Sequence, residues 1–543
     1  MPTPYRRQSL SRHEQRHRRF SSGYVEQKPR TDDMYQSVGH YTTFTVFGAS
    51  GDLAKKKTFP ALFGLFREGE LPEETQILGY ARSKYEQDKF REHLRPFFKK
   101  GNTSKHPDFE AKVEKFLSMI HYVQGQYDTD EGYQKLDQIC QEYEKKHNTT
   151  DEPSRIFYLA LPPSEFTTVA KQLKKNCYPN KGIFRLVVEK PFGHDLESAR
   201  ELQANLAPLF TEDELYRIDH YLGKEMVKNL LVLRFGNELL AGSWNKNHIK
   251  SIQISFKESF GTQGRGGYFD TIGIVRDVMQ NHLLQVLTLL TMERPVSFDP
   301  EAVRDEKVKV LKAIDAIDHN DVIIGQYTAS EDGKEPSYLD DDTVKNKDSK
   351  AATYCALGLQ IHNERWEGVP IVMRAGKALN ESKVEIRIQY KPVAKGMFEA
   401  IQRNELVIRI QPDEAIYLKI NNKIPGISTK TSLTDLDLTY AVRYSDDFWI
   451  PDAYEALIRD VFLGNHSNFV RDDELDVSWS LFTPFLEYIE GPNAPKPELY
   501  PYGSKGPKEL RQFLSKHGYE FADEGIYEWP VTTTKVVDVA EKL

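Results

Sequence analysis

Residues 217 to 225, with the sequence RIDHYLGKE, are the first candidates for chemistry in this chain. Six of these nine residues can ionise or form side-chain hydrogen bonds, and only Ile218 and Leu222 are large and apolar. Charged side chains are rarely buried in a folded domain unless they are paired. The stretch is therefore a candidate binding or catalytic site, and its polar residues are Arg217, Asp219, His220, Tyr221, Lys224 and Glu225.

His282 is a candidate general base, but its spacing also suits an ordinary core residue. In the stretch RDVMQNHLLQVLTLL it shares one helical row with Val278 and Val286. Asp277 precedes it by five residues, about 140° around an α-helix, and so is poorly placed to orient the imidazole. If His282 is a base, its carboxylate partner must come from another part of the chain.

The segment GASGDLA, Gly48 to Ala54, favours a dinucleotide site. It lies between a predicted strand and a predicted helix, where glycines let the backbone approach a pyrophosphate and the helix N-terminus attracts its charge. Its spacing departs from the usual G-x-G-x-x-G, so a plain turn is the alternative. Arg82 follows the second predicted strand, where an NAD site would carry a carboxylate, and a cation there favours NADP. The lysines at 55 to 57 either form a solvated helix face or reach the phosphates.

Two more cationic stretches are candidates for ligand contacts. VVEKPFG places Lys190 and Pro191 just beyond a strand, where α/β sheets bind ligands, although an edge turn is the alternative. The bond between these two residues is a candidate for the cis form. RAGKALNESKVEIR is either an anion site or a solvated edge, and its cations are Arg374, Lys377, Lys383 and Arg387.

The order of strand and helix patterns predicts two folded domains after a tail. Residues 1–40 are rich in Arg and Ser and are predicted to be disordered. Residues 41–218 alternate strands with helices, which predicts a doubly wound, Rossmann-like α/β domain. Residues 219–543 contain IKSIQISFKES, KVEIRIQYK and NELVIRIQP, whose alternation predicts a large α+β domain with a mainly antiparallel sheet and one exposed sheet face. We expect residues 329–350 to form an acidic loop.

Composition excludes several classes of protein. The 543 residues carry a formal net charge of −8, so no overall basic field favours nucleic acid or an anionic membrane. Cys140, Cys177 and Cys355 are too scattered for a disulfide framework or a CxxC metal site, which indicates a reducing compartment such as the cytoplasm. No apolar run is long enough to cross a bilayer. We expect a soluble protein without a metal site, a nucleic-acid partner or a membrane anchor.

Together these stretches resemble the glucose-6-phosphate dehydrogenase family. The resemblance runs from about residue 41 to about residue 530 and rests on GASGDLAKKK, GYARS, EKPFG, RIDHYLGKE, GRGGYFD, VRDVMQNHLLQ, RAGKALNE and YGSKGP. It implies NADP-dependent oxidation of glucose 6-phosphate at C1 to 6-phospho-D-glucono-1,5-lactone, the first step of the oxidative pentose phosphate pathway. It also implies a homodimer or homotetramer formed through the sheet of the large domain.

The resemblance assigns roles to individual residues. It makes His282 the general base, Asp219 the carboxylate that orients it, and Lys190 a bridge between substrate and coenzyme. The residues that it implies for the substrate are His220, Tyr221, Lys224, Glu258, Asp277, Lys377 and Gln411. Those that it implies for NADP are Gly48, Ala49, Ser50, Gly51, Asp52, Leu53, Lys57, Arg82, Tyr158 and Lys190.

The chain departs from the family at three positions. Ser382 stands where some members carry an arginine at the substrate, so that cation is missing unless Lys383 replaces it. Lys505 and Asp523 stand near an arginine and a tyrosine of a second, structural NADP site in the large domain, which weakens that part of the match. The other residues implied for this second site are Arg374, Lys383, Arg387, Arg409, Tyr417, Lys419, Asp437 and Trp529.

Two alternative functions are open to the sequence. One is a dehydrogenase of a related hexose, but His220 and Lys224 would then have no phosphate to bind. The other is an NADP-binding regulatory protein without turnover, although such a protein would not need Asp219, His282 and Lys190 together.

Overall fold

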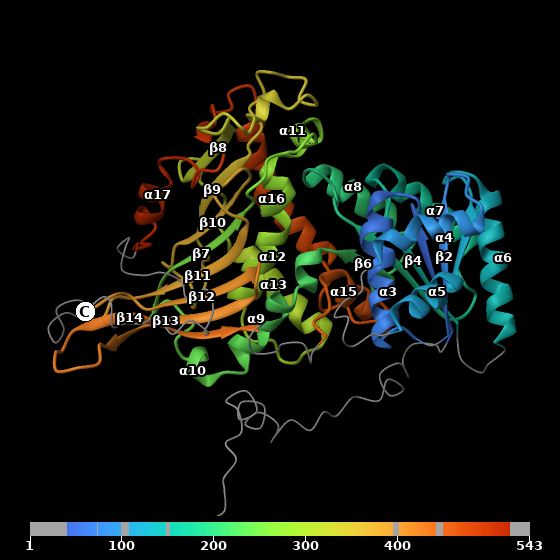
Figure 1. The fold of residues 1–543 in the computed structure, drawn as a ribbon, viewed down its shortest axis with the longest axis horizontal. Helices are drawn as coiled ribbons and strands as arrows, with labels where there is room; N and C mark the ends of the chain where they lie inside the picture. The colour runs from blue at the N-terminus through green and yellow to red at the C-terminus, as the bar shows by residue number, and fades with distance from the viewer. Residues whose placement is uncertain are drawn as a thin grey trace, which may run out of the picture.

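The computed structural model describes residues 41–72, 74–98, 108–147, 153–394, 401–440 and 449–521, so the predicted tail of residues 1–40 lies outside the described part. Two sheets lie beside each other, and each is packed against helices (Figure 1). Within the described residues, no helix is long and apolar enough to span a membrane.

The first sheet confirms the Rossmann-like prediction. Six strands, all parallel, lie in the order β3-β2-β1-β4-β5-β6, which is the strand order of a doubly wound dinucleotide fold. The last strand ends at Ile218, where the first domain was predicted to end. The strands are β1 (Tyr41–Phe47), β2 (Glu74–Ala81), β3 (Ile120–Gln124), β4 (Ser154–Leu159), β5 (Ile183–Glu189) and β6 (Leu215–Ile218).

The helix after β1 begins as a π-helix, and a proline and a glycine mark the start and the end of its α-helical part. It starts as a π-type turn, η1 (Ala54–Thr58), and continues as α3 (Phe59–Glu68) with Pro60 in the first turn. Gly69 ends it in the left-handed conformation with φ 77°, which glycine adopts without a steric cost. The other helices around this sheet are α4 (Gln87–Leu94), α5 (Phe109–Met119), α6 (Asp130–Lys146), α7 (Phe166–Asn176) and α8 (Leu196–Leu206).

The second sheet has nine strands and is mainly antiparallel, as predicted. Its order is β14-β13-β12-β11-β7-β10-β9-β8-β15, with parallel pairs only at β7–β10 and β8–β15 among the described residues. The strands are β7 (Ile249–Lys257), β8 (Val322–Thr328), β9 (Tyr354–Leu359), β10 (Ile371–Gly376), β11 (Lys383–Tyr390), β12 (Glu405–Gln411), β13 (Ala415–Lys423), β14 (Thr431–Thr439) and β15 (Glu498–Pro501).

Helices fill the space between the two sheets. In Figure 1, α12, α13 and α16 lie on the side of the large sheet that faces the first domain. Residues 329–350 form turns and one short 3-10 helix, in agreement with the predicted loop. The helices of this half are α9 (Glu225–Phe235), α10 (Glu238–Ala241), α11 (Gly266–Ile274), α12 (Leu284–Thr291), α13 (Pro300–Ala313), α15 (Ala453–Leu463), α16 (Asp472–Glu490) and α17 (Leu510–Lys516), with the short turns η5 (His220–Gly223) and η6 (Val275–Leu283).

The prediction of one exposed face is wrong for the central strands of the large sheet. Gln253, Glu385 and Gln389 point to the polar face, yet each is at most 5% exposed. They are covered because long side chains lie across the face and because the segment ending at Phe521 packs on it, where Gln389 donates to the Glu520 carbonyl at 2.7 Å. Some of these side chains bond to one another instead of facing water, since Arg374 donates to Gln253 and Arg387 pairs with Glu385.

Candidate active site

The ends of β5 and β6 bring three of the predicted catalytic and binding residues to one edge of the first sheet. Lys190 directly follows β5, and Asp219 and His220 directly follow β6. Asp219 also caps the short turn η5, because its Oδ1 accepts the Tyr221 backbone N–H at 2.9 Å. The parallel sheet therefore fixes the carboxylate of Asp219 at the carboxyl ends of its strands, where such folds bind ligands.

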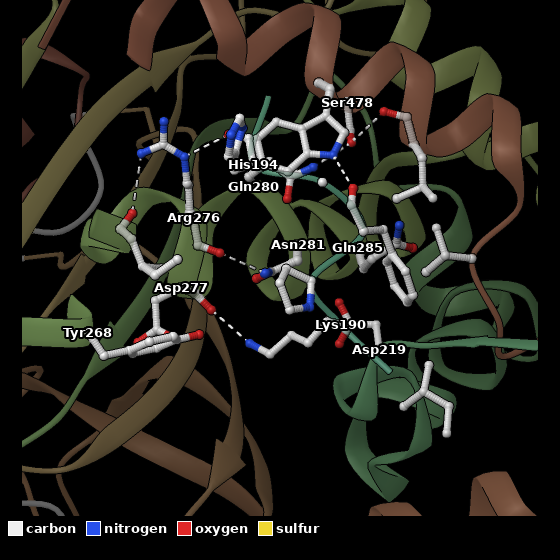
Figure 2. Close-up of a pocket in the computed structure, with 18 residues that line it drawn as sticks. Lys190, His194, Asp219, Tyr268, Arg276, Asp277, Gln280, Asn281, Gln285 and Ser478 are labelled. Atoms are coloured by element: carbon white, nitrogen blue, oxygen red, sulfur yellow. Dashed lines mark hydrogen bonds between the residues drawn. The ribbon is translucent and has the colours of Figure 1, made fainter. Parts of the chain in front are cut away.

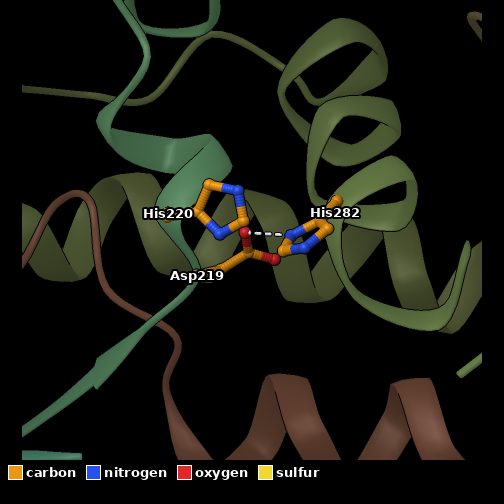
Figure 3. Close-up of side chains that lie close together, drawn as sticks. All are labelled: Asp219, His220 and His282. Atoms are coloured by element: carbon orange, nitrogen blue, oxygen red, sulfur yellow. Dashed lines mark hydrogen bonds and ion pairs between the residues drawn. The ribbon is translucent and has the colours of Figure 1, made fainter. Parts of the chain in front are cut away.

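His282 reaches this edge from the second half of the chain. Its Nδ1 lies 2.5 Å from Oδ1 of Asp219 (Figure 3), and its Nε2 lies 2.8 Å from Nζ of Lys190. The lysine ammonium can only donate, so Nδ1 carries the imidazole proton and Nε2 keeps its lone pair. Asp219 and His282 thus form a dyad, and Asp219 is the carboxylate from another part of the chain that His282 needs as a base.

The charges around the dyad favour a neutral imidazole beside an ionised carboxylate. Burial and the nearby Lys190 ammonium lower the pKa of His282, although Asp219 opposes this shift. Burial alone would raise the pKa of Asp219, but the hydrogen bond from His282 and the neighbouring Lys190 hold that pKa well below its usual range. A neutral histidine whose Nε2 is unprotonated, oriented by an anion, can act as a general base.

The helix that carries His282 differs from the predicted α-helix. Residues 275 to 283 form η6, a π-type turn, which closes hydrogen bonds over five residues instead of four. As predicted, the Asp277 side chain does not orient His282. The backbone carbonyl of Asp277 accepts from Lys190 Nζ at 2.9 Å (Figure 2), and the Asp277 carboxylate lies 3.4 Å from Lys377. Asp277 therefore acts on the base indirectly, by holding Lys190.

A second set of charged residues lies next to the dyad. Lys377 pairs with Glu258 at 2.5 Å and with Asp277, and these two carboxylates raise the pKa of Lys377 against the effect of burial. On the other side, Lys224 donates to Gln411 at 2.7 Å, and burial lowers its pKa. The structure therefore brings together all of the residues predicted for the substrate, which are His220, Tyr221, Lys224, Glu258, Asp277, Lys377 and Gln411.

Aromatic contacts hold the imidazoles in place. The Tyr221 ring stacks on His282 with centroids 4.5 Å apart, and His220 meets the same imidazole edge-on at 4.5 Å. Asp219, His220 and His282 also bring atoms of metal-binding type within 4.8 Å of one another. Both imidazole nitrogens of His282 already have partners, since Nε2 faces the Lys190 ammonium and Nδ1 is bonded to Asp219. The cluster is therefore explained by the His–Asp dyad.

A cavity of about 100 Å³ opens beside the dyad, and some of the residues that line it were not singled out from the sequence (Figure 2). Lys190, Asp219 and Asp277 form part of its wall. Oδ2 of Asp219 has no hydrogen-bond partner and is buried. The Trp479 indole donates to the Phe192 carbonyl at 2.9 Å, so α16 holds the turn that carries Lys190. The lining residues missed by sequence reasoning include Tyr268, Gln280, Asn281, Ser478 and Trp479.

The predicted dinucleotide loop lies at the carboxyl end of β1. Gly48 has φ 72°, and a Cβ there would lie 2.3 Å from the Ala160 carbonyl oxygen, so only glycine fits this turn. The carboxylate of Asp52 is bonded to Lys55 and Lys56, which lower its pKa to about 2. The remaining predicted residues of the loop, Ala49, Ser50, Gly51, Leu53 and Lys57, lie in the same turn and in η1.

Arg82 lies close to this loop and is accessible. Its side chain is 60% exposed and packs 5.0 Å above the Tyr127 ring, while Ser50 and Ser83 bring their hydroxyls within 3.2 Å of each other. A cation and two hydroxyls at the ends of β1 and β2 fit a phosphate on the ribose of a dinucleotide. The residues present therefore fit the coenzyme that the sequence predicts.

Tyr158 does not match its predicted contact with a coenzyme. It is fully buried, because it points from the last but one position of β4 into the core and donates its hydroxyl to Glu189. Burial also raises the pKa of Glu189 to about 7, next to Lys190. Tyr158 therefore exposes no atom to a ligand at the strand ends.

The residues predicted for a second coenzyme share the polar face of the large sheet. Arg387 pairs with Glu385 and Glu405, and Lys419 lies 3.5 Å from Glu405. Strand register places the other described members on the same face, and these are Arg374, Lys383, Arg409, Tyr417 and Asp437. Trp529 lies outside the described residues, as does Asp523.

Comparison with known proteins identifies the family. The profile described as "Glucose-6-phosphate dehydrogenase, NAD binding domain" matches residues 45–229, and the profile described as "Glucose-6-phosphate dehydrogenase, C-terminal domain" matches residues 231–522. The chain belongs to the glucose-6-phosphate dehydrogenase family. The two profiles together cover the second sheet, all of the first sheet except residues 41–44, and every described residue of the site.

Relatives in this family cover nearly the whole chain. The glucose-6-phosphate 1-dehydrogenase of Cyberlindnera jadinii is 69% identical over 92% of this chain and 100% of its own, and that of Saccharomyces cerevisiae is 65% identical over 90% and 96%. A solved structure described as "Glucose-6-phosphate dehydrogenase in complex with its substrate glucose-6-phosphate" is 65% identical, with a TM-score of 0.86 over 89% of this chain and 99% of its own. The enzyme of Mycobacterium avium matches at 32% identity with a TM-score of 0.75 over 91% of this chain and 100% of its own.

The position where some family members carry an arginine has no replacement cation here. Ser382 accepts from the Ser259 backbone N–H at 2.9 Å and bonds to its hydroxyl. The Nζ of Lys383 lies 2.7 Å from Glu381, so this neighbouring lysine is already paired. The charge of Lys383 is therefore already balanced by a neighbouring carboxylate.

Proposed function

We propose that the protein oxidises glucose 6-phosphate at C1 with NADP, producing 6-phospho-D-glucono-1,5-lactone and NADPH. The observation that carries this proposal is the position of His282, held between Asp219 and Lys190 at the ends of β5 and β6. A base and its orienting anion lie there beside cations that can bind a phosphate. The family membership of the chain supports the same reaction.

The chemistry of the chain's own residues centres on one proton. When bound, NADP would supply the hydride acceptor for C1 of the sugar. His282 takes the proton of the C1 hydroxyl at Nε2, once the hydroxyl replaces Lys190 as the donor to that lone pair. Asp219 stabilises the imidazolium that forms, because its Oδ1 accepts from Nδ1 throughout. Lys190 lies next to Nε2 and so is placed to orient the C1 oxygen.

Recognition of the phosphate rests on the turn after β6. We assign His220 and Lys224 to the phosphate, because both lie beside the dyad and a free sugar would give them no anion. Lys377 with Glu258 and Asp277 then binds sugar hydroxyls from the opposite side. This division of the charges supports a phosphorylated hexose over a free one.

Choice of coenzyme, location and assembly complete the proposal. The exposed guanidinium of Arg82 favours the 2′-phosphate of NADP over the bare ribose of NAD. The cations on the polar face of the large sheet, with Arg387 and Lys419 at its centre, support a second NADP there. We also propose a cytoplasmic enzyme that assembles as a homodimer or homotetramer through this sheet.

The direct test follows NADPH absorbance with NADP and glucose 6-phosphate, beside parallel reactions with free glucose or with NAD. We expect rapid turnover only with the phosphorylated sugar and NADP. The variant His282→Ala should bind glucose 6-phosphate nearly as the unsubstituted protein does but react at least ~100-fold more slowly, the lower end of what a positioned base contributes. His194→Ala, which changes an exposed histidine near the same cavity, serves as the matched control. Full activity in His282→Ala would overturn the mechanism.

A further inference from the structure

Helix α15 belongs to the second half of the sequence but packs in the core of the first domain. Leu457, Val461 and Phe462 are fully buried in the same cluster as residues of β1 and β4. The Phe462 ring stacks on Phe44 of β1 with centroids 5.4 Å apart, and Arg185 of β5 donates to the carbonyls at the end of α15, at 2.7 and 2.9 Å. Figure 1 shows α15 at the junction of the two halves.

The same helix also touches the turn that carries the proposed phosphate site. A Cβ on Gly223, the last residue of η5, would lie 2.3 Å from the carbonyl oxygen of Ala453 at the start of α15. Backbone therefore lies against backbone at this point, and neither element can move far without the other. One rigid helix thus joins the coenzyme domain to the substrate turn.

Tyr454, in the first turn of α15, lies between the two ligand sites. Its ring is nearly parallel to the His220 imidazole, at 9° and 5.9 Å between centroids. The ammonium of Lys57, at the end of the dinucleotide loop, lies 5.9 Å from the centre of the same ring. Burial, together with the negative charges of Glu189 and Asp219, raises the pKa of Tyr454, so the phenol stays neutral. It is thus a neutral aromatic surface between Lys57 and His220.

We propose that Tyr454 couples the coenzyme site to the phosphate site. A coenzyme bound at the dinucleotide loop fixes Lys57 over one part of the ring, and the ordered ring then holds His220 in the position that receives the phosphate. Because the ordering is already complete when the sugar phosphate arrives, the sugar phosphate binds more tightly than it would to the protein without coenzyme. The coupling must act equally in both directions. Tyr454 is a positioning residue in this scheme, and the inference rests on the proposed function.

The coupling can be measured without turnover. NADPH occupies the coenzyme site but cannot oxidise glucose 6-phosphate, so calorimetry gives the dissociation constant of the sugar phosphate with and without bound coenzyme. For the unsubstituted protein we expect NADPH to tighten glucose 6-phosphate binding by ~5-fold or more, the lower range for coupled sites. In Tyr454→Ala this ratio should fall to about 1, while Tyr454→Phe, which keeps the ring, should retain it.

Two further variants separate coupling from a merely structural effect. Lys57→Met removes the cation and should abolish the ratio as Tyr454→Ala does, and the double variant should lose nothing more. Arg459→Gln changes the same helix at its contact with Glu70, away from the ligand sites, and should keep the full ratio. An unchanged ratio in Tyr454→Ala, or a ratio of about 1 in the unsubstituted protein, overturns the inference while leaving the reaction intact. Failure of glucose 6-phosphate to bind or react at all would instead overturn the proposed function, and the inference with it.

Discussion

At the scale of single residues, the proposed base is held between two opposing charges. Asp219 favours the protonated form of His282, whereas burial and Lys190 favour the neutral form, and the neutral form prevails. Both neighbours also form hydrogen bonds with the ring, so they fix its tautomer as well as its charge. The pH dependence of the reaction should therefore report on this balance.

The acid side of the rate profile is the first test of this balance. A base works only when it is unprotonated, so kcat/KM should fall as the pH drops through the pKa of His282, which lies below the ordinary histidine value. Asp219→Asn removes the charge that raises this pKa, and the acid limb should then move to still lower pH. Turnover should also fall at least ~100-fold, because the imidazolium loses its partner. An acid limb that stays in place in Asp219→Asn would contradict the dyad.

Ser382 offers a second test at this scale. Ser382→Arg would return a cation to the substrate end, where Lys383 is paired with Glu381. Because exposed charge pairs contribute up to ~1 kcal/mol, we expect KM for glucose 6-phosphate to fall by up to ~5-fold with kcat unchanged. Steady-state kinetics beside Ser382→Ala give the comparison. A KM that rises in the arginine variant would show that this position does not face the phosphate.

Much of the site could be predicted from residue types, but its geometry could not. The resemblance located Asp219, His282 and Lys190, while the spacing alone left His282 as an ordinary core residue. The π-helix η6, which carries His282, has no signature in the sequence. It packs against β7 and β10, and contacts between distant segments are not visible in a local pattern. Tyr158 was implied for the coenzyme by the resemblance alone, and the sequence could not show that its side chain points into the core.

At the scale of elements, the contact between η5 and α15 determines the shape of the proposed phosphate site. Hydrophobic patterning predicted several strands, among them β1, β7, β11 and β12, since that feature is local. The packing of α15 against β1 is a contact between residues more than 400 positions apart, and no local pattern indicates it.

The close approach at Gly223 makes this contact sensitive to a single methyl group. Gly223→Ala would place a Cβ 2.3 Å from a backbone oxygen and 2.9 Å from Leu457, so η5 and α15 must separate. We expect a loss of about 1–3 kcal/mol in the free energy of unfolding, as for other overpacked positions, measured by urea denaturation. Gly242→Ala is the matched control, because the nearest atom to its Cβ is 3.9 Å away. Equal stability of the two variants would contradict this packing argument.

At the scale of the whole molecule, the free edge of the large sheet should determine assembly. β14 is one of the two edge strands of the sheet, the other being β15, and Leu436 of β14 is 58% exposed. An exposed apolar side chain on an edge strand invites pairing with another chain. The alternation of apolar and polar residues predicted a mainly antiparallel sheet but not the order of its strands. Which face is covered depends on long charged side chains that the alternation does not distinguish.

Light scattering after gel filtration can test this assembly. We expect the protein to have a mass of two or four times the 62.7 kDa chain, and we expect Leu436→Lys to shift the population towards single chains at low concentration. Val296→Lys, at an apolar residue that is 97% exposed in a loop outside the sheet, should leave the mass unchanged. A purely monomeric protein before substitution would contradict the proposed interface.

The place of α15 in the first core has a consequence for synthesis on the ribosome. When the first six strands have emerged, the patch of β1 and β4 that will receive Leu457 and Phe462 is still bare. At ~5–20 residues per second, the ribosome needs roughly ten to fifty seconds more to deliver α15. Throughout that interval the nascent chain presents an apolar surface with no partner of its own, and this is the surface that a chaperone would be expected to protect.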